Sequence, residues 1–229
     1  MTYTWLLFDA DGTLFDYDRA EQSALKNTFS QLGYPYKQEY LAEYRKVNHH
    51  IWFEFERGEI DQITLRTRRF QLLFQAINIQ ADPHEFSPRY LENLADGTDL
   101  IDGAAETLKL LSGTFNLAII TNGLKEVQRP RFRKSTINRY ITETIISDEI
   151  GPAKPDPKIF DIAFTCMGHP AKDQVLIIGD SLTSDIQGGL NYGIDTCWFN
   201  PAGSKNSHQI ATTFEIQRLA ELPGLLGVT

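Results

Sequence analysis

An apolar run that ends in two closely spaced aspartates constrains this chain most strongly. Residues Trp5 to Phe8 are apolar and short enough for one buried strand. Asp9 and Asp11 follow at once, and Gly12 lets the chain turn sharply. Carboxylates there are costly to bury and repel each other, and a dication such as Mg²⁺ removes both penalties. We therefore expect a metal site beyond this strand, although an Asx-rich turn also fits the run taken alone.

The rest of the chain divides into a helical segment and an alternating segment. From Asp18 to about Ala95, apolar residues recur at helical spacing, which predicts a helical bundle inserted after the first strand. Beyond it, helical stretches alternate with apolar strands, which predicts an α/β fold with a doubly wound parallel sheet. We therefore assign residues 1–15 and 97–229 to an α/β core and residues 16–96 to an inserted helical domain, the cap.

Composition narrows the classes of partner that the chain could bind. Its 229 residues are 41% hydrophobic, which is enough for a substantial core. A formal net charge of −8 argues against a binder of nucleic acid polymers. No apolar run approaches a membrane span, and the first residues lack a secretion signal, so we expect a cytoplasmic protein without a membrane partner. A monomer and a dimer both remain open.

Further polar residues stand where they could meet a phosphate group. Thr121 and Asn122 follow an apolar strand, where a hydroxyl and amides at a helix start could hold phosphate oxygens. A helix cap explains Thr121 equally well. Lys154 lies in a proline-rich loop, where a lysine is normally a solvated charge. Beside a phosphoryl group it would neutralise developing negative charge.

Two more aspartates follow a third apolar strand. Asp180 comes directly after that strand and would bind Mg²⁺. Asp185 falls in the first turn of a helix that we expect over residues 184–191, where an acidic side chain also favours the helix dipole. We interpret it as a group that supports the metal site indirectly or through water.

These motifs, in this order, resemble those of the haloacid dehalogenase (HAD) phosphohydrolases. The motifs are Asp9 to Leu14, Ile119 to Gly123, Lys154 to Asp156, and Ile178 to Ser181 with Asp185. The resemblance implies that Asp9 is a nucleophile that forms an aspartyl-phosphate intermediate, and that Asp11 is the general acid and base. It also implies that Asp9, the backbone carbonyl of Asp11 and Asp180 hold Mg²⁺. Thr121, Asn122 and Lys154 would then bind the substrate phosphate.

The second aspartate discriminates among the reactions of that superfamily. Dehalogenases of similar fold lack it and need no Mg²⁺, so Asp11 favours phosphoryl transfer. A phosphomutase remains open, because these motifs alone do not exclude one. A rival from another class is a receiver-like signalling domain with a phosphoacceptor aspartate, but receivers are smaller and have no helical insert after the first strand.

The position of the cap narrows the substrate to a small phosphorylated metabolite. Insertion after the first motif resembles the C1-capped subfamily, whose caps close over small molecules. The segment Trp52 to Ile60, with Asn122 and Gly123, resembles the bacterial pyrimidine 5′-nucleotidase branch. We therefore expect a phosphatase of nucleoside 5′-monophosphates, with a sugar-phosphate or phosphoglycolate phosphatase as the alternative.

Aromatic and basic side chains outside the motifs have plainer interpretations. The aromatic residues of the expected second cap helix fit a cap core better than a surface on which a base stacks; they are Trp52, Phe53 and Phe55. The clustered basic residues are interpreted as solvated helix faces; they are Arg66, Arg68, Arg69, Arg131, Arg133 and Lys134.

Overall fold

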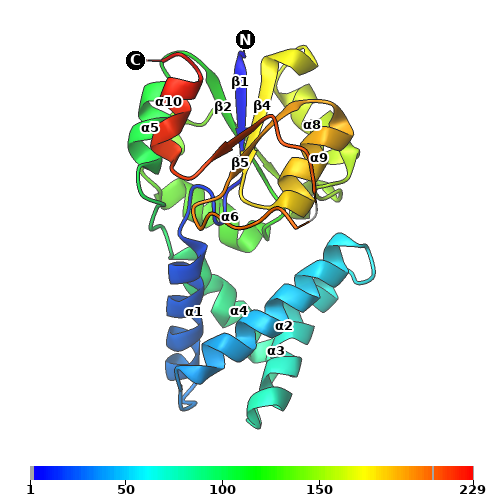
Figure 1. Ribbon diagram of the computed structural model, residues 1–229. Helices are drawn as coiled ribbons and strands as arrows, with labels where there is room; N and C mark the ends of the chain where they lie inside the picture. The colour runs from blue at the N-terminus through cyan, green and yellow to red at the C-terminus, as the bar shows by residue number, and fades with distance from the viewer. Residues whose placement is uncertain (1–2, 208, 229) are drawn as a thin grey trace. The chain divides into compact units, whose positions relative to one another are not determined.

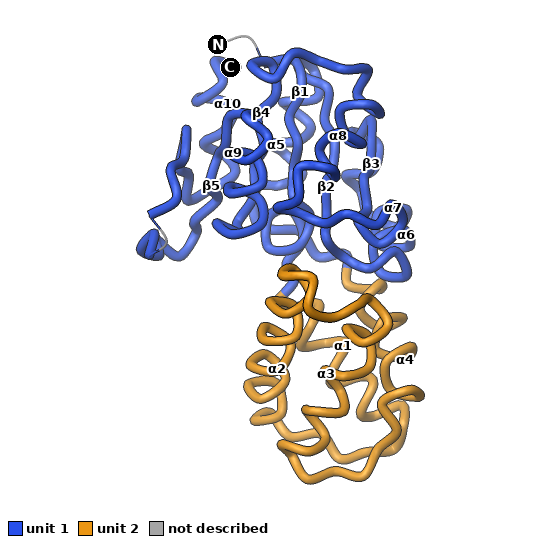
Figure 2. The backbone as a smooth tube through the Cα atoms, turned by 90° about the vertical axis from the view of Figure 1, so that its right-hand side faces the viewer, with its two compact units in different colours: residues 1–17, 98–229 blue, residues 18–97 orange. Residues whose placement is uncertain are grey.

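The computed structural model of the protein describes residues 3–207 and 209–228. The chain forms two compact units, one from residues 1–17 and 98–229 and the other from residues 18–97 (Figure 2). Parts of the expected core range lie outside the described residues; they are residues 1, 2, 208 and 229.

A six-stranded parallel sheet forms the centre of the first unit (Figure 1). The strands are β1 (Trp5–Phe8), β2 (Asn116–Thr121), β3 (Glu143–Ile146), β4 (Val175–Gly179), β5 (Asp195–Phe199) and β6 (Phe214–Ile216). Their order is β3-β2-β1-β4-β5-β6, and each strand is parallel to its neighbours. Because β1 lies between β2 and β4, the carboxyl ends of these strands meet at one edge of the sheet. The short strand β6 was not foreseen in the sequence.

Helices cover both faces of this sheet. They are α5 (Ala104–Leu111), α6 (Lys125–Lys134), α7 (Ser147–Ile150), α8 (Pro157–Cys166), α9 (Gln187–Tyr192) and α10 (Leu222–Leu225), with 3₁₀ turns at Asn138–Tyr140, Lys172–Gln174 and Leu219–Glu221. Leu6 and Phe8 of β1 join the buried cluster of one face, and Leu7 joins that of the other. Figure 1 shows α5 and α10 on one side of the sheet and α8 and α9 on the other. The predicted doubly wound α/β fold is therefore confirmed.

The segment after β4 differs from the single helix expected over residues 184–191. A π-helical turn, Leu182–Ile186, comes first, and α9 follows it. Ser181 stabilises this turn, because its Oγ accepts a hydrogen bond from the backbone N–H of Ser184 at 3.2 Å. Turns of this kind are rare in proteins overall, and those that do occur often lie at functional sites.

The second unit consists of helices around an aromatic core. The helices are α1 (Tyr17–Gln31), α2 (Glu39–Glu56), α3 (Gln62–Ile77) and α4 (Pro83–Ala95). The ring of Phe86 lies 5.0 Å from those of Phe29 and Phe70, centroid to centroid. Asp61 and Asp82 accept hydrogen bonds from backbone N–H groups at the starts of α3 and α4. Buried rings and capped helix starts together explain why this segment folds as a bundle.

Two expectations for this unit were wrong. Phe53 of α2 is 47% exposed, so its ring lies outside the core of this unit, and Trp52 and Phe55 are only half-buried. Arg69 is buried, not solvated, and its guanidinium donates to Asn48 Oδ1 at 3.2 Å. It also lies over the ring of Phe70, where the aromatic face compensates part of the lost hydration.

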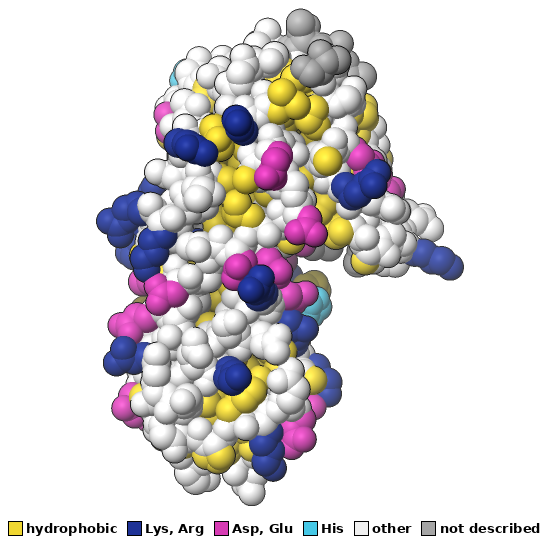
Figure 3. All heavy atoms as spheres, turned by 90° about the vertical axis from the view of Figure 1, so that its left-hand side faces the viewer, with side chains coloured by type: hydrophobic (Ala, Val, Ile, Leu, Met, Phe, Trp, Pro, Cys, Tyr) yellow, Lys and Arg dark blue, Asp and Glu magenta, His cyan; other side chains and the backbone are white. Residues whose placement is uncertain are grey.

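The surface mixes charges of both signs. Figure 3 shows acidic and basic side chains interspersed over the face that it draws. No helix among residues 3–207 and 209–228 combines the length and the apolar content that crossing a bilayer requires.

Close packing of α9 against the sheet predicts a large cost for one added methyl group. A Cβ on Gly189 would lie 2.7 Å from methyl carbons of Ile177 and Thr196. We expect Gly189→Ala to lower the free energy of unfolding by about 1–3 kcal/mol, measured by urea denaturation. Gly224 of α10 is the matched control, because its added Cβ meets nothing within 4 Å. Gly224→Ala should leave stability unchanged or raise it by up to about 1 kcal/mol, and equal effects at the two sites would contradict this packing argument.

Candidate active site

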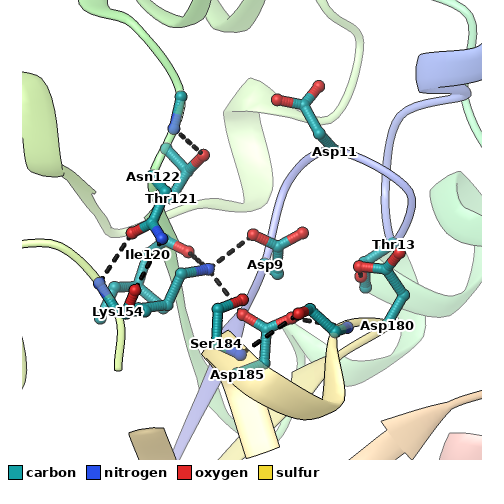
Figure 4. Close-up of polar contacts among 12 residues, drawn as sticks. Asp9, Asp11, Thr13, Ile120, Thr121, Asn122, Lys154, Asp180, Ser184 and Asp185 are labelled. Atoms are coloured by element: carbon teal, nitrogen blue, oxygen red, sulfur yellow. Dashed lines mark hydrogen bonds and ion pairs between the residues drawn. The ribbon is translucent and has the colours of Figure 1, made fainter. Parts of the chain in front are cut away.

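Neighbouring strands bring the predicted site residues to one edge of the sheet. Asp9 directly follows β1, Thr121 ends β2 and Asp180 directly follows β4. The backbone N–H of Asp9 still donates to Ile178 of β4 at 2.9 Å, so the strand pairing fixes its position. Figure 4 shows the carboxylates of Asp9, Asp180 and Asp185 grouped around this edge with the amine of Lys154.

The buried amine of Lys154 contacts one residue of β2 and two residues that follow β1 and β4. Its Nζ lies 2.6 Å from Asp9 Oδ1 and 2.7 Å from Asp185 Oδ1. It also donates to the backbone carbonyl of Ile120 at 2.7 Å. Burial opposes its charged form, but the carboxylates of Asp185 and Asp9 outweigh burial and hold the pKa of Lys154 above its usual value. The residue is only 1% exposed, so Lys154 is not the solvated charge that a lysine in a loop normally is, and its role in catalysis stays a prediction.

The acidic cluster sets three carboxyl groups against the single positive charge of Lys154. Oxygens of Asp9, Asp180 and Asp185 lie within 4.8 Å of one another. Burial, and then the charges of Asp185 and Asp180, raise the pKa of Asp9 despite the opposing pull of Lys154. Asp180 is exposed as a residue, but desolvation of its carboxylate by the surrounding protein, and then the charge of Asp185, raise its pKa to about 7. Such crowded oxygens fit a hard dication, which would remove their repulsion.

Asp185 has partners for both of its carboxylate oxygens. Oδ1 receives Lys154, and Oδ2 accepts the backbone N–H of Ser181 at 3.0 Å. These bonds fit the expected supporting role, in which Asp185 holds the lysine and the loop after β4 in place.

Two glycines allow this crowding. Gly12 has a φ of +84°, and a Cβ on it would lie 2.6 Å from Asp180 Oδ2. A Cβ on Gly179 would lie 2.3 Å from the carboxylate carbon of Asp185. Any larger residue at either position would push a carboxylate out of the cluster.

The side chain of Asn122 is engaged in holding the lysine loop. Its Oδ1 accepts the backbone N–H of Lys154, and its Nδ2 donates to the Lys154 carbonyl, both at 2.8 Å. Thr121 Oγ1 accepts the backbone N–H of Gly123 at 3.0 Å. Phosphate binding by this segment stays a prediction. In Asn122 the backbone N–H would have to donate to the phosphate, because the side-chain amide already bonds to both backbone groups of Lys154.

Asp11 is placed differently from the other predicted acids. Its carboxylate points away from that of Asp9 in Figure 4 and does not belong to the acidic cluster. Two side chains of α6 contact it instead. Gln128 Nε2 donates to Oδ2 at 2.5 Å, and Arg131 Nη1 pairs with Oδ1.

Arg131 corrects the expectation of a solvated helix face. It is 0% exposed, whereas Arg133 and Lys134 are exposed as expected. Neither Gln128 nor Arg131 was assigned to the site from the sequence. Their spacing of i and i+3 on a helix, which puts both on one face, was the available signal.

Known proteins resemble this chain over almost its whole length. The sequence model of the haloacid dehalogenase-like hydrolases matches residues 6–199. HAD-hydrolase YfnB of Bacillus subtilis (strain 168) is 35% identical over 99% of this chain and 96% of its own length. Pyrimidine 5′-nucleotidase YjjG of Escherichia coli (strain K12) is 33% identical over 99% of both chains. Pyrimidine 5′-nucleotidase PynA of Streptococcus pneumoniae is 34% identical over 97% of this chain and 94% of its own.

Solved structures show the same architecture. A crystal structure of Bacillus subtilis YfnB bound to magnesium superposes with a TM-score of 0.94 over 100% of both chains, at 35% identity. An L-2-haloacid dehalogenase from Xanthobacter autotrophicus, at 16% identity, shares the fold with a TM-score of 0.79 over 99% of both chains.

The raised pKa of Asp180 predicts how one substitution changes stability. Because the folded-state pKa is about 7, against 3.8 for an unperturbed aspartate, ionisation of Asp180 costs stability increasingly as the pH rises between these values. Without metal at pH 8, Asp180→Asn should therefore melt at a higher temperature than the wild type, and the difference should shrink in acid. Added MgCl₂ should raise the melting temperature of the wild type much more than that of the variant.

The exposed Asp173 provides the control for general charge effects. Asp173→Asn should keep the full response to MgCl₂. A wild-type response to MgCl₂ in Asp180→Asn would contradict a metal site at the acidic cluster.

Proposed function

Because this chain belongs to the haloacid dehalogenase-like hydrolase family, we propose that it is a Mg²⁺-dependent phosphatase of small phosphate monoesters, with Asp9 as nucleophile. The family resemblance predicted from the motifs, and with it the hydrolase class, is confirmed by the match over residues 6–199. One observation carries the proposal: the strand ends bring a buried carboxylate, Asp9, against both a lysine and further acidic groups.

In the first step, a carboxylate oxygen of Asp9 attacks phosphorus and the bond between phosphorus and the ester oxygen breaks. Asp11 donates a proton to the departing alkoxide, which leaves as an alcohol. In the second step, Asp11 takes a proton from water, and the water oxygen attacks the phosphorus of the aspartyl-phosphate. Inorganic phosphate leaves, and the Asp9 carboxylate is regenerated.

The other site residues bind charge and keep the geometry. Asp9, the backbone carbonyl of Asp11 and Asp180 would hold Mg²⁺, which supplies charge neutralisation for the phosphoryl oxygens. Lys154 adds a second positive charge at the nucleophile. Thr121 and the backbone N–H of Asn122 are the proposed phosphate donors, at the start of the segment that leads into α6.

For the substrate, we propose a nucleoside 5′-monophosphate, most readily one with a pyrimidine base. Two relatives at 33% and 34% identity are named pyrimidine 5′-nucleotidases. Exposure of Phe53, with Trp52 and Phe55 only half-buried, leaves aromatic surface on α2 that the cap core does not use. Stacking of an aromatic ring on a base contributes about 1–3 kcal/mol to binding, which corresponds to a roughly ten- to hundredfold higher affinity.

The nucleophile assignment predicts the behaviour of one isosteric variant. Asp9→Asn should abolish hydrolysis of p-nitrophenyl phosphate while the far-ultraviolet circular dichroism spectrum stays that of the wild type, because the amide is a poor nucleophile. If Asp9→Asn retains even about a tenth of wild-type kcat, the assignment is wrong.

The proposed metal dependence predicts that excess EDTA abolishes wild-type turnover and that MgCl₂ restores it.

The substrate proposal is tested by kcat/KM across two classes of ester. We expect UMP, dUMP and dTMP to exceed glucose 6-phosphate and phosphoglycolate by roughly ten- to a hundredfold. Equal or higher values for the esters without a base would refute a nucleotidase, while the phosphatase proposal would still stand.

A further inference from the structure

Helix α6 holds the carboxylate of Asp11 from both of its oxygens. Gln128 Nε2 lies 2.5 Å from Oδ2, and Arg131 Nη1 is ion-paired with Oδ1. Both α6 side chains are fully buried, whereas the side chain of Asp11 keeps 25% of its surface exposed. The carboxylate is therefore accessible from the solvent side and fixed from the protein side.

We propose that Arg131, together with Gln128, is a positioning residue for acid–base catalysis, which fixes the orientation of the Asp11 carboxylate toward the leaving group. This inference rests on the proposed function, in which Asp11 exchanges protons with the ester oxygen and with water. It adds a role for two residues of α6 that bind neither the phosphate nor the metal.

The surroundings of the pair prevent it from moving freely. The guanidinium of Arg131 lies over the ring of Phe15, 5.3 Å from its centroid, and Phe15 packs on Phe132 of the same helix. Gln128 Nε2 also lies 3.5 Å from Thr121 Oγ1. A Cβ on Gly123 would come within 2.2 Å of Gln128 Nε2, so a glycine there leaves room for this amide.

The energetics of burial favour a role for this pair beyond stability. Water already hydrates the exposed side of the Asp11 carboxylate, so its charge needs no buried partner. Burying the guanidinium of Arg131, in contrast, is costly. Burying Arg131 to reach this carboxylate therefore costs free energy, and the stability of the fold does not require that contact. The orientation of Asp11 is the feature that this contact determines.

That orientation suits a general acid. In-line attack places the nucleophile and the leaving oxygen on opposite sides of phosphorus. The acid must therefore stand apart from the Asp9 carboxylate, and the Asp11 carboxylate points away from it (Figure 4). Loss of Arg131 would let the Asp11 side chain adopt other rotamers, and the proton would less often meet the ester oxygen.

Dependence on the leaving group distinguishes positioning from a general structural role. Arg131→Met should lower kcat for a nucleoside 5′-monophosphate, whose alkoxide needs a proton, at least about tenfold more than kcat for p-nitrophenyl phosphate, which needs little protonation. Arg131→Lys, which keeps the charge but not the fork of donors, should give an intermediate loss. KM should change much less than kcat in both variants.

Arg129 provides a matched control on the same helix. It is exposed and ion-paired with Glu149 at 2.6 and 2.8 Å, away from Asp11. Arg129→Met should leave the ratio of the two kcat values at that of the wild type. Gln128→Met is the second test variant and should shift the ratio in the same direction as Arg131→Met, so it decides the question if the latter fails to fold.

Asp11→Asn separates this inference from the function on which it rests. If Asp11→Asn lowers kcat equally for both esters, the proposed acid–base role of Asp11 is wrong. If Asp11→Asn discriminates between the esters while folded Arg131→Met and Gln128→Met do not, the positioning role is wrong. Adding Arg131→Met to Asp11→Asn should change the ratio no further, and an additional shift would also overturn the proposal.

Discussion

The buried ion pair between Lys154 and Asp9 is the interaction on which the rest of the site depends. A lysine that is 1% exposed is tolerated only with partners, and it has Asp9, Asp185 and a backbone carbonyl of β2. These contacts tie a loop to the ends of three parallel strands. Lys154 and its two carboxylates depend on one another, because removing one carboxylate would leave the buried positive charge only partly compensated.

The carboxylates around Lys154 exceed the single charge that it supplies, and this imbalance is built into the backbone. Glycines at positions 12 and 179 let the carboxylates of Asp180 and Asp185 approach the chain more closely than any side chain would allow. Asn122 fixes the lysine loop by bonding both backbone groups of Lys154. The fold thus holds negative charges together at the cost of stability, which is typical of a site that binds a cation and an anionic substrate.

How far the sequence predicted the structure depended on the kind of signal. Parallel strands that end in aspartate, threonine or glycine–aspartate predicted both the fold and the residues that meet, because the carboxyl ends of such strands share one edge. Arg131 and Gln128 were missed because α6 is rich in charged residues, and composition does not tell which face of such a helix is buried. Arg69 was misjudged because aromatic rings lie against its guanidinium and compensate for its burial, and residue spacing does not reveal such contacts.

Covalent trapping on the protein tests the central claim most directly, namely that Asp9 carries the phosphoryl group. The Asp11→Asn variant, which should lose the base for the second step, would be mixed with an activated phosphate ester and MgCl₂, quenched with acid and treated with borohydride. Borohydride reduces an aspartyl-phosphate to homoserine, and peptide mass spectrometry locates it. The account predicts homoserine at position 9. Release of the leaving group with an unmodified Asp9, or with homoserine at another aspartate, would contradict it.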